Sequence, residues 1–309
     1  MSMRTATARL GTVLVVLAAG VFGTASSRAG SGPGDAQPAA AAAPAAAAED
    51  AACDTATSLP PAKKAGAKIE AIRKHGSLVV GIDQNSYNWG YRNAVTGEIQ
   101  GFDIDLAKAI ATAIFGEPKL TLKAVPTARR IEAVKNGEVD MIVRTMTITC
   151  ERMKEVAFSS PYFKVSQSLV VPKSVKAATV AEGLKGKRVC AAAKSSSETE
   201  LASGKHATAE VKIVENQLDC LVLMQLGKID ATLADTVLAY AQVAQDDMVQ
   251  VQGEPIVPAF MGIAMNKADT DLIAWVNQVL VDYRTSGQWL KAYDKWLRSS
   301  MEGHERWLP

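Results

Sequence analysis

Short apolar runs alternate with amphipathic segments along the chain from about residue 77 onward. Residues 77–82 (SLVVGI) are an apolar run ended by polar residues, which predicts a buried strand. In residues 101–116 apolar side chains recur at every fourth position, two aspartates lie in the first turn and a glycine ends the segment, which predicts an amphipathic helix. Residues 120–125 predict a strand, residues 130–136 a helix and residues 139–143 a second buried strand. Strands that alternate with helices favour an α/β architecture with a largely parallel sheet.

The same order of elements recurs later in the chain. Residues 135–143 (KNGEVDMIV) end one predicted helix and open a strand, and residues 225–233 (QLGKIDATL) repeat this pattern. Residues 188–192 likewise echo the strand at residues 78–82. We therefore expect two lobes, each with its own sheet. Small ligands in such folds bind outside the carboxyl ends of the strands and in the cleft between lobes, which close by a hinge motion.

The strand at residues 139–143 leads into the strongest candidate for chemistry. Residues 144–162 (RTMTITCERMKEVAFSSPY) place Thr149 as the N-cap of a short helix that carries Arg152. Hydroxyl groups, free backbone N–H groups and a guanidinium at one turn can bind an anion, and Arg152 can hold a carboxylate through two hydrogen bonds. The alternative is a structural cap followed by a surface arginine.

Polar residues also follow two predicted strands of the second lobe. The serine-rich turn at residues 194–197 (KSSS) can hold a carboxylate, although Lys194 by default is a solvated loop residue. Asp235 can accept hydrogen bonds from an ammonium group, and its alternative role is a plain N-cap for a helix at residues 236–245. An arginine and a threonine on one lobe and an aspartate on the other match the two charged groups of a free amino acid.

The N-terminal residues indicate the compartment. Two arginines precede an apolar or small run at residues 10–25, and small-residue cleavage points follow it, which is the pattern of a secretory signal. Retention of the run as an anchor stays open. No cysteine follows the run directly, so a lipid anchor is not supported, and the Ala-rich residues 30–52 indicate a tether outside the fold. We expect an exported protein, secreted or associated with the cell surface.

Charge and residue patterns exclude several classes of partner and chemistry. The formal net charge is +2 and no basic block alternates with aromatic residues, so nucleic acid is not an expected partner. The three histidines have no ligand-like spacing, and no nucleophile, base and orienting group come together. We therefore expect no metal, no cofactor and no catalysis.

Four cysteines in an exported chain favour two disulfides, for which three pairings are possible. Cys190 lies on a predicted strand and Cys220 on the helix-like stretch that follows in the same region, so we pair them. Cys53 and Cys150 remain, and their bond would staple the N-terminal extension beside the turn that carries Arg152. Four free thiols or a metal site are the weaker alternative, since no C-x-x-C occurs.

Several motifs together resemble the family 3 extracellular solute-binding proteins that deliver polar amino acids to ABC importers, in particular the glutamate- and glutamine-binding branch of actinobacteria. The resemblance spans roughly residues 77–297 and includes the cysteines of TCER, RVC and DC. Its main motifs are GFDIDLAKAIA (101–111), VDMIVRTMTITCERMKEVAFSSPYF (139–163), KIDATLADT (228–236) and MGIAMNK (261–267).

This resemblance implies a two-lobed periplasmic-binding-protein-like fold of type II, in which the chain crosses twice between the lobes. Lobe 1 is then expected at residues 68–163 and 262–297, and lobe 2 at residues 164–261. The signal peptide, the tether, an N-terminal extension and a C-terminal tail account for the rest, at residues 1–29, 30–52, 53–67 and 298–309.

The same resemblance implies roles for individual residues. Arg152 and Thr147 would contact the α-carboxylate of the ligand, Asp235 its α-ammonium group and Asp83 its side chain, while Arg144 and Thr145 would line the floor. Trp89 or Tyr91 would pack on the methylene groups of the ligand, or alternatively belong to the core or the lip. The remaining candidate contacts are Lys194, Ser196 and Arg92.

Many relatives have a small residue at the position of Arg144. Because a fixed cation there would favour a carboxylate side chain, we expect a monomer that binds glutamate or aspartate and delivers it to an ABC transporter permease. Glutamine or asparagine as the ligand is one alternative, and a sensor subunit read by a membrane partner is another. An enzyme related to cyclic acid dehydratases is a weaker hypothesis.

Overall fold

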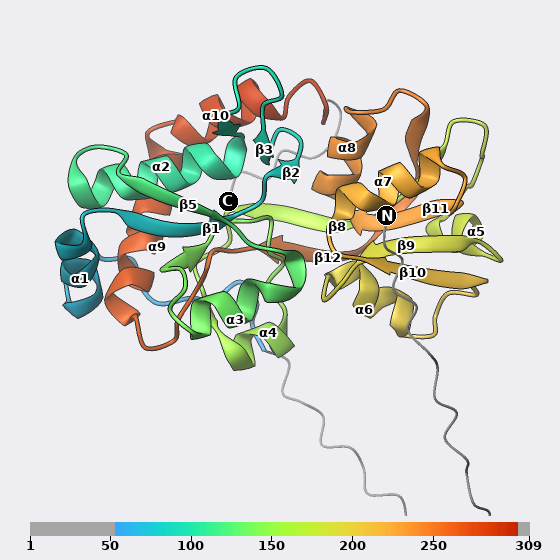
Figure 1. Cartoon of the computed structure of the whole chain (residues 1–309). Helices are drawn as coiled ribbons and strands as arrows, with labels where there is room; N and C mark the ends of the chain where they lie inside the picture. Colours follow the sequence, from blue (N-terminus) through green and yellow to red (C-terminus); the bar gives the residue numbers. More distant parts are fainter. Residues whose placement is uncertain (1–52, 302–309) are drawn as a thin grey trace, which may run out of the picture. The chain divides into compact units, whose positions relative to one another are not determined.

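The computed structural model describes residues 53–301, which form two five-stranded sheets, one short three-stranded sheet and the helices that cover them (Figure 1). The predicted signal peptide at residues 1–29, the tether at residues 30–52 and the end of the tail at residues 302–309 lie outside the described residues. Within residues 53–301 no helix has the length and apolar character needed to cross a membrane.

The first sheet contains β1 (Leu78–Ile82), β5 (Leu120–Ala124), β6 (Met141–Ile142), β7 (Ala157–Phe158) and β13 (Ala264–Met265). Their order is β5-β1-β6-β13-β7. β1 is parallel to β5 and β6, as predicted, but β13 is antiparallel to β6 and β7, so the prediction of a largely parallel sheet is wrong for that half. The reason is connectivity: the chain reaches β13 from β12 of the second sheet, so no helical crossover within the first sheet leads into β13.

The second sheet contains β8 (Phe163–Pro172), β9 (Arg188–Ala192), β10 (Glu210–Val214), β11 (Ala231–Asp235) and β12 (Val249–Met261). Their order is β10-β9-β11-β8-β12. β9 is parallel to β10 and β11, and β8 is antiparallel to β11 and β12. Two parallel pairings followed by two antiparallel ones repeat the first sheet.

The predicted sequence repeat is also visible in the turns that enter β6 and β11. Gly137 and Gly227 adopt φ values of 69° and 64°, a conformation that favours glycine. Three residues later, the carboxylate of Asp140 accepts the N–H of Val79 in β1 (2.8 Å), and that of Asp230 accepts the N–H of Arg188 in β9 (2.9 Å). Both sheets therefore use the same device to fix the register of the central strands.

Helices cover both faces of each five-stranded sheet. On the first sheet one core cluster includes α1, α2, α9 and α10, and a second lies under α3 and α4; on the second sheet α5 and α6 pack on one face and α7 and α8 on the other. The predicted helix at 101–116 is confirmed as α2. The bounds are α1 (Ala67–His75), α2 (Phe102–Phe115), η1 (Thr127–Arg129), α3 (Arg130–Lys135), α4 (Cys150–Glu155), α5 (Val180–Leu184), α6 (Ser196–Ala202), α7 (Gln217–Gln225), α8 (Thr236–Val243), α9 (Thr270–Thr285) and α10 (Gln288–Trp296).

The chain passes between the sheets at two neighbouring points. It enters the second sheet at Phe163 and leaves it at Met261, and these two residues are paired across β8 and β12. The ring of Phe163 packs against Trp89 and Trp289 of the first core, with ring centroids 5.0 and 5.7 Å apart. The two crossovers are therefore side by side and set in aromatic packing. The short sheet of β2 (Asn85–Ser86), β3 (Gly90–Arg92) and β4 (Ile99–Gln100) follows β1.

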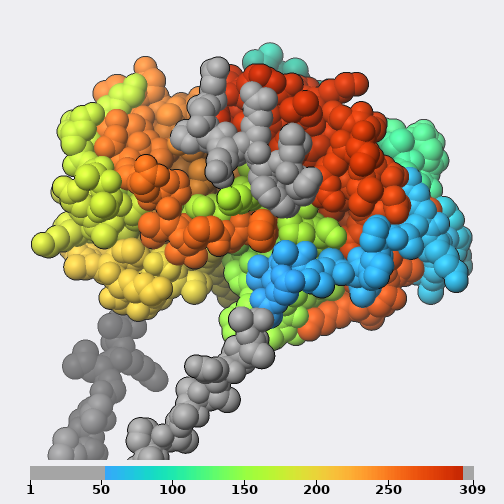
Figure 2. Space-filling view, turned by 180° about the vertical axis from the view of Figure 1, so that it is seen from behind, coloured from blue at the N-terminus to red at the C-terminus, as the bar shows by residue number. Residues whose placement is uncertain are grey.

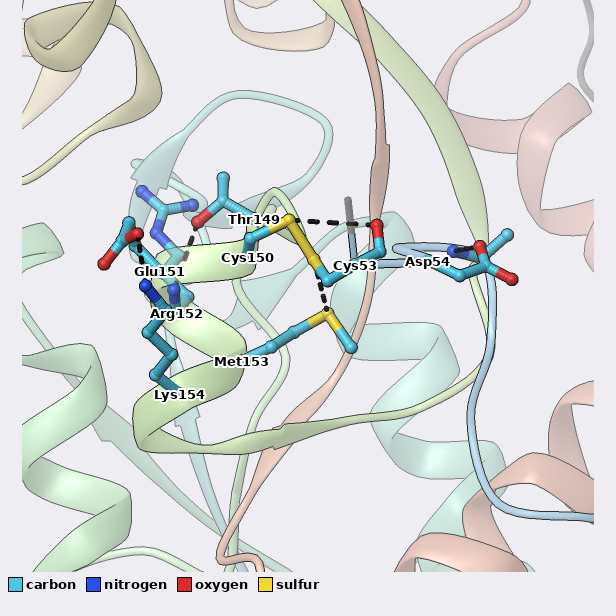
Figure 3. The surroundings of a disulfide bond; sticks show 9 residues. Cys53, Asp54, Thr149, Cys150, Glu151, Arg152, Met153 and Lys154 are labelled. Carbon is cyan, nitrogen blue, oxygen red and sulfur yellow. Dashed lines mark hydrogen bonds and ion pairs between the residues drawn. A yellow bond between two sulfur atoms is a disulfide. The ribbon is translucent and has the colours of Figure 1, made fainter. Parts of the chain in front are cut away.

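Two disulfides have the expected pairing. Cys190 in β9 is joined to Cys220 in α7, and both are fully buried. Cys53 is joined to Cys150 at the start of α4, where both are half-buried (Figure 3). The extension that begins at Cys53 runs over the surface of the first sheet's helices and is visible as the blue segment of Figure 2.

Candidate functional site

A small cavity lies where the carboxyl ends of strands from both sheets meet. Asp83 follows β1, Arg144 and Thr145 follow β6, the serines at residues 195–197 follow β9, and Asp235 ends β11, and all of them line the cavity. Its volume is about 20 Å³, which is room for about one water molecule and not for an amino acid. A solute can therefore bind only if the two sheets move apart, as the hinge prediction requires.

The hydrogen-bond and ion-pair partners of Asp83 all belong to its own lobe. One carboxylate oxygen accepts the backbone N–H groups of Gln84 (2.8 Å) and Asn85 (3.0 Å). The other accepts the hydroxyl of Ser86 (2.7 Å) and forms an ion pair with Arg144 (3.1 Å). Since the side chains of Asp83 and Arg144 are only 9% and 4% exposed, the two charges largely neutralise each other in a buried setting.

Arg144 retains one unused donor. Its Nε is buried, and no group within residues 53–301 accepts a hydrogen bond from it. A buried donor without a partner is costly and is uncommon in native structures. Because Arg144 lines the cavity, this N–H is a candidate donor to an acceptor on a bound solute.

The floor of the cavity is held by a buried acid. Thr145 has a φ of 42°, a strained value for a β-branched residue, and its N–H donates to Asp103 (2.8 Å). The second oxygen of Asp103 accepts the hydroxyl of Tyr162 (3.0 Å). Burial raises the pKa of Asp103 to about 7, while the hydrogen bonds from Thr145 and Tyr162 oppose this shift.

Asp235 receives only neutral donors. Thr147, in the segment between β6 and α4, donates its hydroxyl to one carboxylate oxygen (2.8 Å), and Ser196 (2.9 Å) and the amide of Gln167 donate to the other. Asp235 occupies the N-cap position of α8, but its side chain makes no capping hydrogen bond. The plain N-cap alternative is therefore excluded as the role of this side chain, which instead faces the cavity.

Arg152 stands at the edge of the cavity on α4. Thr149 caps this helix as predicted, because its hydroxyl accepts the backbone N–H of Arg152 (3.2 Å). The guanidinium donates to the carbonyl of Thr147 (2.6 Å) and, across the cleft, to the carbonyl of Lys194 (3.0 Å). Burial lowers the pKa of Arg152 and the carboxylate of Asp235 opposes that shift. The guanidinium thus bridges the two lobes through backbone oxygens.

Some expected contacts lie elsewhere. Trp89 is 1% exposed and packs in the first core against Phe102 and Phe163, so it is the core residue of the alternative. Arg92 is exposed and donates to the carbonyl of Gly97 (2.7 Å), because it closes the turn between β3 and β4. Neither belongs to the cavity lining, and the interpretation of both as ligand contacts is corrected.

The remaining candidates are at or near the cavity. Lys194 contributes its backbone carbonyl to Arg152, while its exposed side chain lines a neighbouring groove of about 350 Å³ between α3 and α4. Thr147 reaches the site through its bond to Asp235. Those that line the cavity are Asp83, Arg144, Thr145, Arg152, Ser196 and Asp235.

The structure adds residues that sequence reasoning missed. Arg130 is 4% exposed, lines the cavity and donates its Nε–H to the carbonyl of Thr127 (3.0 Å). Burial lowers its pKa, as do the nearby charges of Arg152 and Arg144. Its signal in the sequence was an arginine that shares one helix face with Ala133 and Val134. The signal for Gln167 in the sequence was a polar residue within the apolar strand β8. Gln217, like Arg130, lines the cavity.

Three guanidinium groups and two carboxylates from two opposed sheets surround one cavity, so the molecule is a two-lobed α/β binding protein for a small charged or zwitterionic solute. The chain belongs to the bacterial extracellular solute-binding proteins, family 3, whose model matches residues 78–299. The members of this class bind solutes, and the chain is not an enzyme.

Individual relatives agree with this assignment. The chain is 36% identical over 251 residues to the ABC transporter glutamine-binding protein GlnH of Bacillus subtilis, covering 80% of this chain and 92% of the relative. It is 24% identical to the glutamate-binding protein GluB of Corynebacterium efficiens, covering 70% and 77%. Among solved structures, an ancestral arginine-binding protein bound to glutamine superposes with a TM-score of 0.67 and 34% identity, covering 72% of this chain and 98% of that structure.

Proposed function

We propose that this protein binds free glutamine outside the cell and delivers it to an ABC transporter permease. The observation that carries the proposal is the charge arrangement of the cavity. Asp235 on one sheet has neutral donors only, Arg152 stands opposite it, and a neutralised Asp83–Arg144 pair forms the floor. A zwitterion with a neutral polar side chain complements these three features.

The α-carboxylate is assigned to Arg152 and Thr147. When the sheets separate, the guanidinium of Arg152 loses its bond to the carbonyl of Lys194, and the hydroxyl of Thr147 loses its bond to Asp235. Both donors then become free at the same side of the cleft. A guanidinium and a hydroxyl are suited to a carboxylate, since charge-assisted hydrogen bonds are the stronger ones.

The α-ammonium group is assigned to Asp235. A bound ammonium would replace the hydroxyl of Thr147 and the amide of Gln167 as donors to the carboxylate, which now lacks a cationic partner among residues 53–301. The charge of Asp235 has only neutral donors around it and can pair with a cationic group of the ligand. The charge of Asp83, in contrast, is balanced by Arg144.

The side chain of glutamine is assigned to Asp83 and Arg144. The amide oxygen can accept from the unused Nε–H of Arg144, and the amide NH₂ can donate to Asp83. Our expectation of an acidic ligand rested on a free cation at Arg144, and the ion pair with Asp83 removes that basis. The Bacillus relative named for glutamine and the glutamine-bound ancestral structure support the same choice.

Glutamate is the second candidate. Arg130 adds a third guanidinium to a cavity lined by two carboxylates, so the lining carries one surplus positive charge. A ligand with a net negative charge would neutralise it. The Corynebacterium relative is named for glutamate, in line with this arrangement.

Calorimetric titration of the purified protein with glutamine, glutamate, asparagine, aspartate and arginine tests the proposal. We expect glutamine to bind most tightly and glutamate next, with the shorter and the cationic amino acids weaker. Tighter binding of glutamate than of glutamine would transfer the function to the second candidate. No binding of any amino acid would overturn the proposed function.

The remaining features of the proposal concern organisation. The crossovers at Phe163 and Met261 support lobes at residues 68–163 with 262–297 and at residues 164–261. Closure of these lobes around the ligand in a monomer is part of the proposal. Export through the N-terminal signal is consistent with the family and with two disulfides.

A further inference from the structure

We propose that the Cys53–Cys150 disulfide positions Arg152 for the ligand carboxylate, so that this bond controls ligand affinity as well as stability. The inference rests on the carboxylate role of Arg152 in the proposed function. The disulfide would thus affect ligand binding although it does not itself line the cavity.

Packing holds the helix that carries Arg152 only in part. α4 has six residues and none of them is fully buried, and the partly buried Met153 packs against the second core cluster of the first sheet. Helices of this length are not stable alone, so contacts with the rest of the molecule must fix the position of α4. Two such contacts are the exposed pair of Lys135 with Glu155 and the bond from Lys267 to the carbonyl of Lys154 (2.7 Å). Exposed contacts of this kind contribute little.

The disulfide holds the end of α4 that matters for the site. Cys150 is the first residue of α4, directly after the cap Thr149 and two residues before Arg152. The sulfur of Cys53 also lies 3.9 Å from that of Met153. Figure 3 shows Cys150 and Met153 on one side of the helix and the guanidinium of Arg152 on the other. The staple therefore fixes the face opposite Arg152.

The other end of the staple is firmly attached. Ser58 donates to the carbonyl of Phe158 (2.7 Å), and Asn277 of α9 donates to the carbonyl of Leu59 (2.6 Å). Further along, the N–H of Ala62 donates to a carbonyl of α9 (3.0 Å). Asn277 is 1% exposed, so the donor of the bond to Leu59 is buried. The extension from Cys53 to Ala62 thus links α9 to the start of α4.

The second disulfide serves as a matched comparison. Cys190 and Cys220 join β9 to α7 inside the core of the second sheet, and both are fully buried. This bond makes no contact with α4. Its removal is expected to lower stability without changing how the carboxylate is held.

The test uses the full chain with Cys53→Ala and Cys150→Ala together, and two probes, glutamine and its α-carboxamide. In the wild type we expect glutamine to bind more tightly, because only glutamine offers a carboxylate to Arg152. In the variant we expect glutamine to bind about tenfold more weakly, the loss of one hydrogen bond to a charged group, with the α-carboxamide unchanged. The ratio of the two dissociation constants is the readout.

A merely structural staple would weaken both probes equally and leave the ratio intact, and that result would overturn the inference. Cys190→Ala with Cys220→Ala is expected to lower the melting temperature and to preserve the ratio. If this control does not fold, Lys63→Ala at the exposed pair with Asp282 replaces it. Arg152→Lys alone should lower the ratio. Removing the Cys53–Cys150 disulfide in the Arg152→Lys background should lower the ratio little further, since both changes act on one contact.

Failure of the proposed function gives a different result. If the wild type does not distinguish glutamine from its α-carboxamide, or Arg152→Lys has no effect, the carboxylate role of Arg152 falls and the inference with it. If Arg152→Lys lowers the ratio and the staple variant does not, only the inference falls. Treatment with a low concentration of dithiothreitol checks the inference without a variant. Dithiothreitol reduces the half-buried Cys53–Cys150 bond to two thiols and is itself oxidised to its cyclic disulfide. The ratio should fall before the buried Cys190–Cys220 bond reacts.

Discussion

The two carboxylates at the cavity, Asp83 and Asp235, occupy similar places and have opposite surroundings. Each lies at the carboxyl end of a central strand of its sheet. Asp83 receives two backbone N–H groups, a hydroxyl and the guanidinium of Arg144, all from its own lobe. Asp235 receives two hydroxyls and an amide, one of them from the opposite sheet, and no basic side chain of residues 53–301 forms an ion pair with it.

This difference explains how one site can hold two kinds of polar group. A carboxylate with an internal counter-ion acts with it as a neutral donor and acceptor pair, which suits an amide. A carboxylate with neutral partners retains its charge, which suits an ammonium ion. The hydrogen bond from Thr147 to Asp235 also joins the two lobes directly.

The largest effect is expected for Asp235→Asn. The amide keeps the size of the side chain and removes its charge, so the ligand ammonium loses a buried ionic partner. We expect binding of every α-amino acid to weaken by about 2–5 kcal/mol, measured by calorimetric titration. Ser196→Ala is the matched control, because it removes one neutral donor to Asp235, and should cost about 1 kcal/mol. Equal losses in the two variants would contradict the special role of the charge.

A smaller and selective effect is expected for Asp83→Asn. The substitution leaves the guanidinium of Arg144 without its counter-ion, and a free cation favours a carboxylate over an amide. We expect the ratio of glutamate to glutamine affinity to rise about tenfold, which is about 1.4 kcal/mol. Ser86→Ala, which removes only a hydroxyl donor to Asp83, should leave the ratio unchanged. An unchanged ratio in Asp83→Asn would mean that this pair does not contact the ligand side chain.

Much of this arrangement could be predicted from the sequence. The N-cap Thr149, the strand ends that carry Asp83 and Asp235, and the helix–turn–strand repeat all depend on local patterns, and the structure agrees with them. The resemblance added the pairing of these ends across a cleft.

The features that could not be predicted from the sequence depend on contacts between segments that are distant along the chain. Whether Arg144 is free or paired is decided by Asp83, which lies sixty-one positions earlier in the chain. Arg130 was predicted only as part of a helix, and its place at the cavity depends on the burial of that helix face. Trp89 was expected either on the ligand or in the core or lip, because aromatic residues near strand ends serve both cores and sites, and only packing distinguishes the two.

A separate prediction concerns stability and Asp103 beneath the floor. Its pKa of about 7 in the folded chain is above the ordinary value of 3.8, so the folded state holds a proton that the unfolded state releases first. The contribution of this group to the unfolding free energy therefore falls as pH rises from about 4 to about 7, by at most about 1.4 kcal/mol for each pH unit. Asp103→Asn removes this titration.

We expect the unfolding free energy of Asp103→Asn, relative to the wild type, to rise with pH up to about 7 and then to level off. Urea unfolding of both proteins at pH 5, 6, 7 and 8 measures the difference. Parallel pH curves would show that Asp103 is ionised in the folded chain over this whole range.

The division of roles between Asp83 and Asp235 is tested most directly by a crystal structure of the protein with glutamine. The account predicts that the ligand ammonium lies about 3 Å from the carboxylate of Asp235, and that the side-chain amide contacts Asp83 and the Nε of Arg144. A complex in which the ammonium group contacts Asp83, or in which the side chain points away from the Asp83–Arg144 pair, would contradict it.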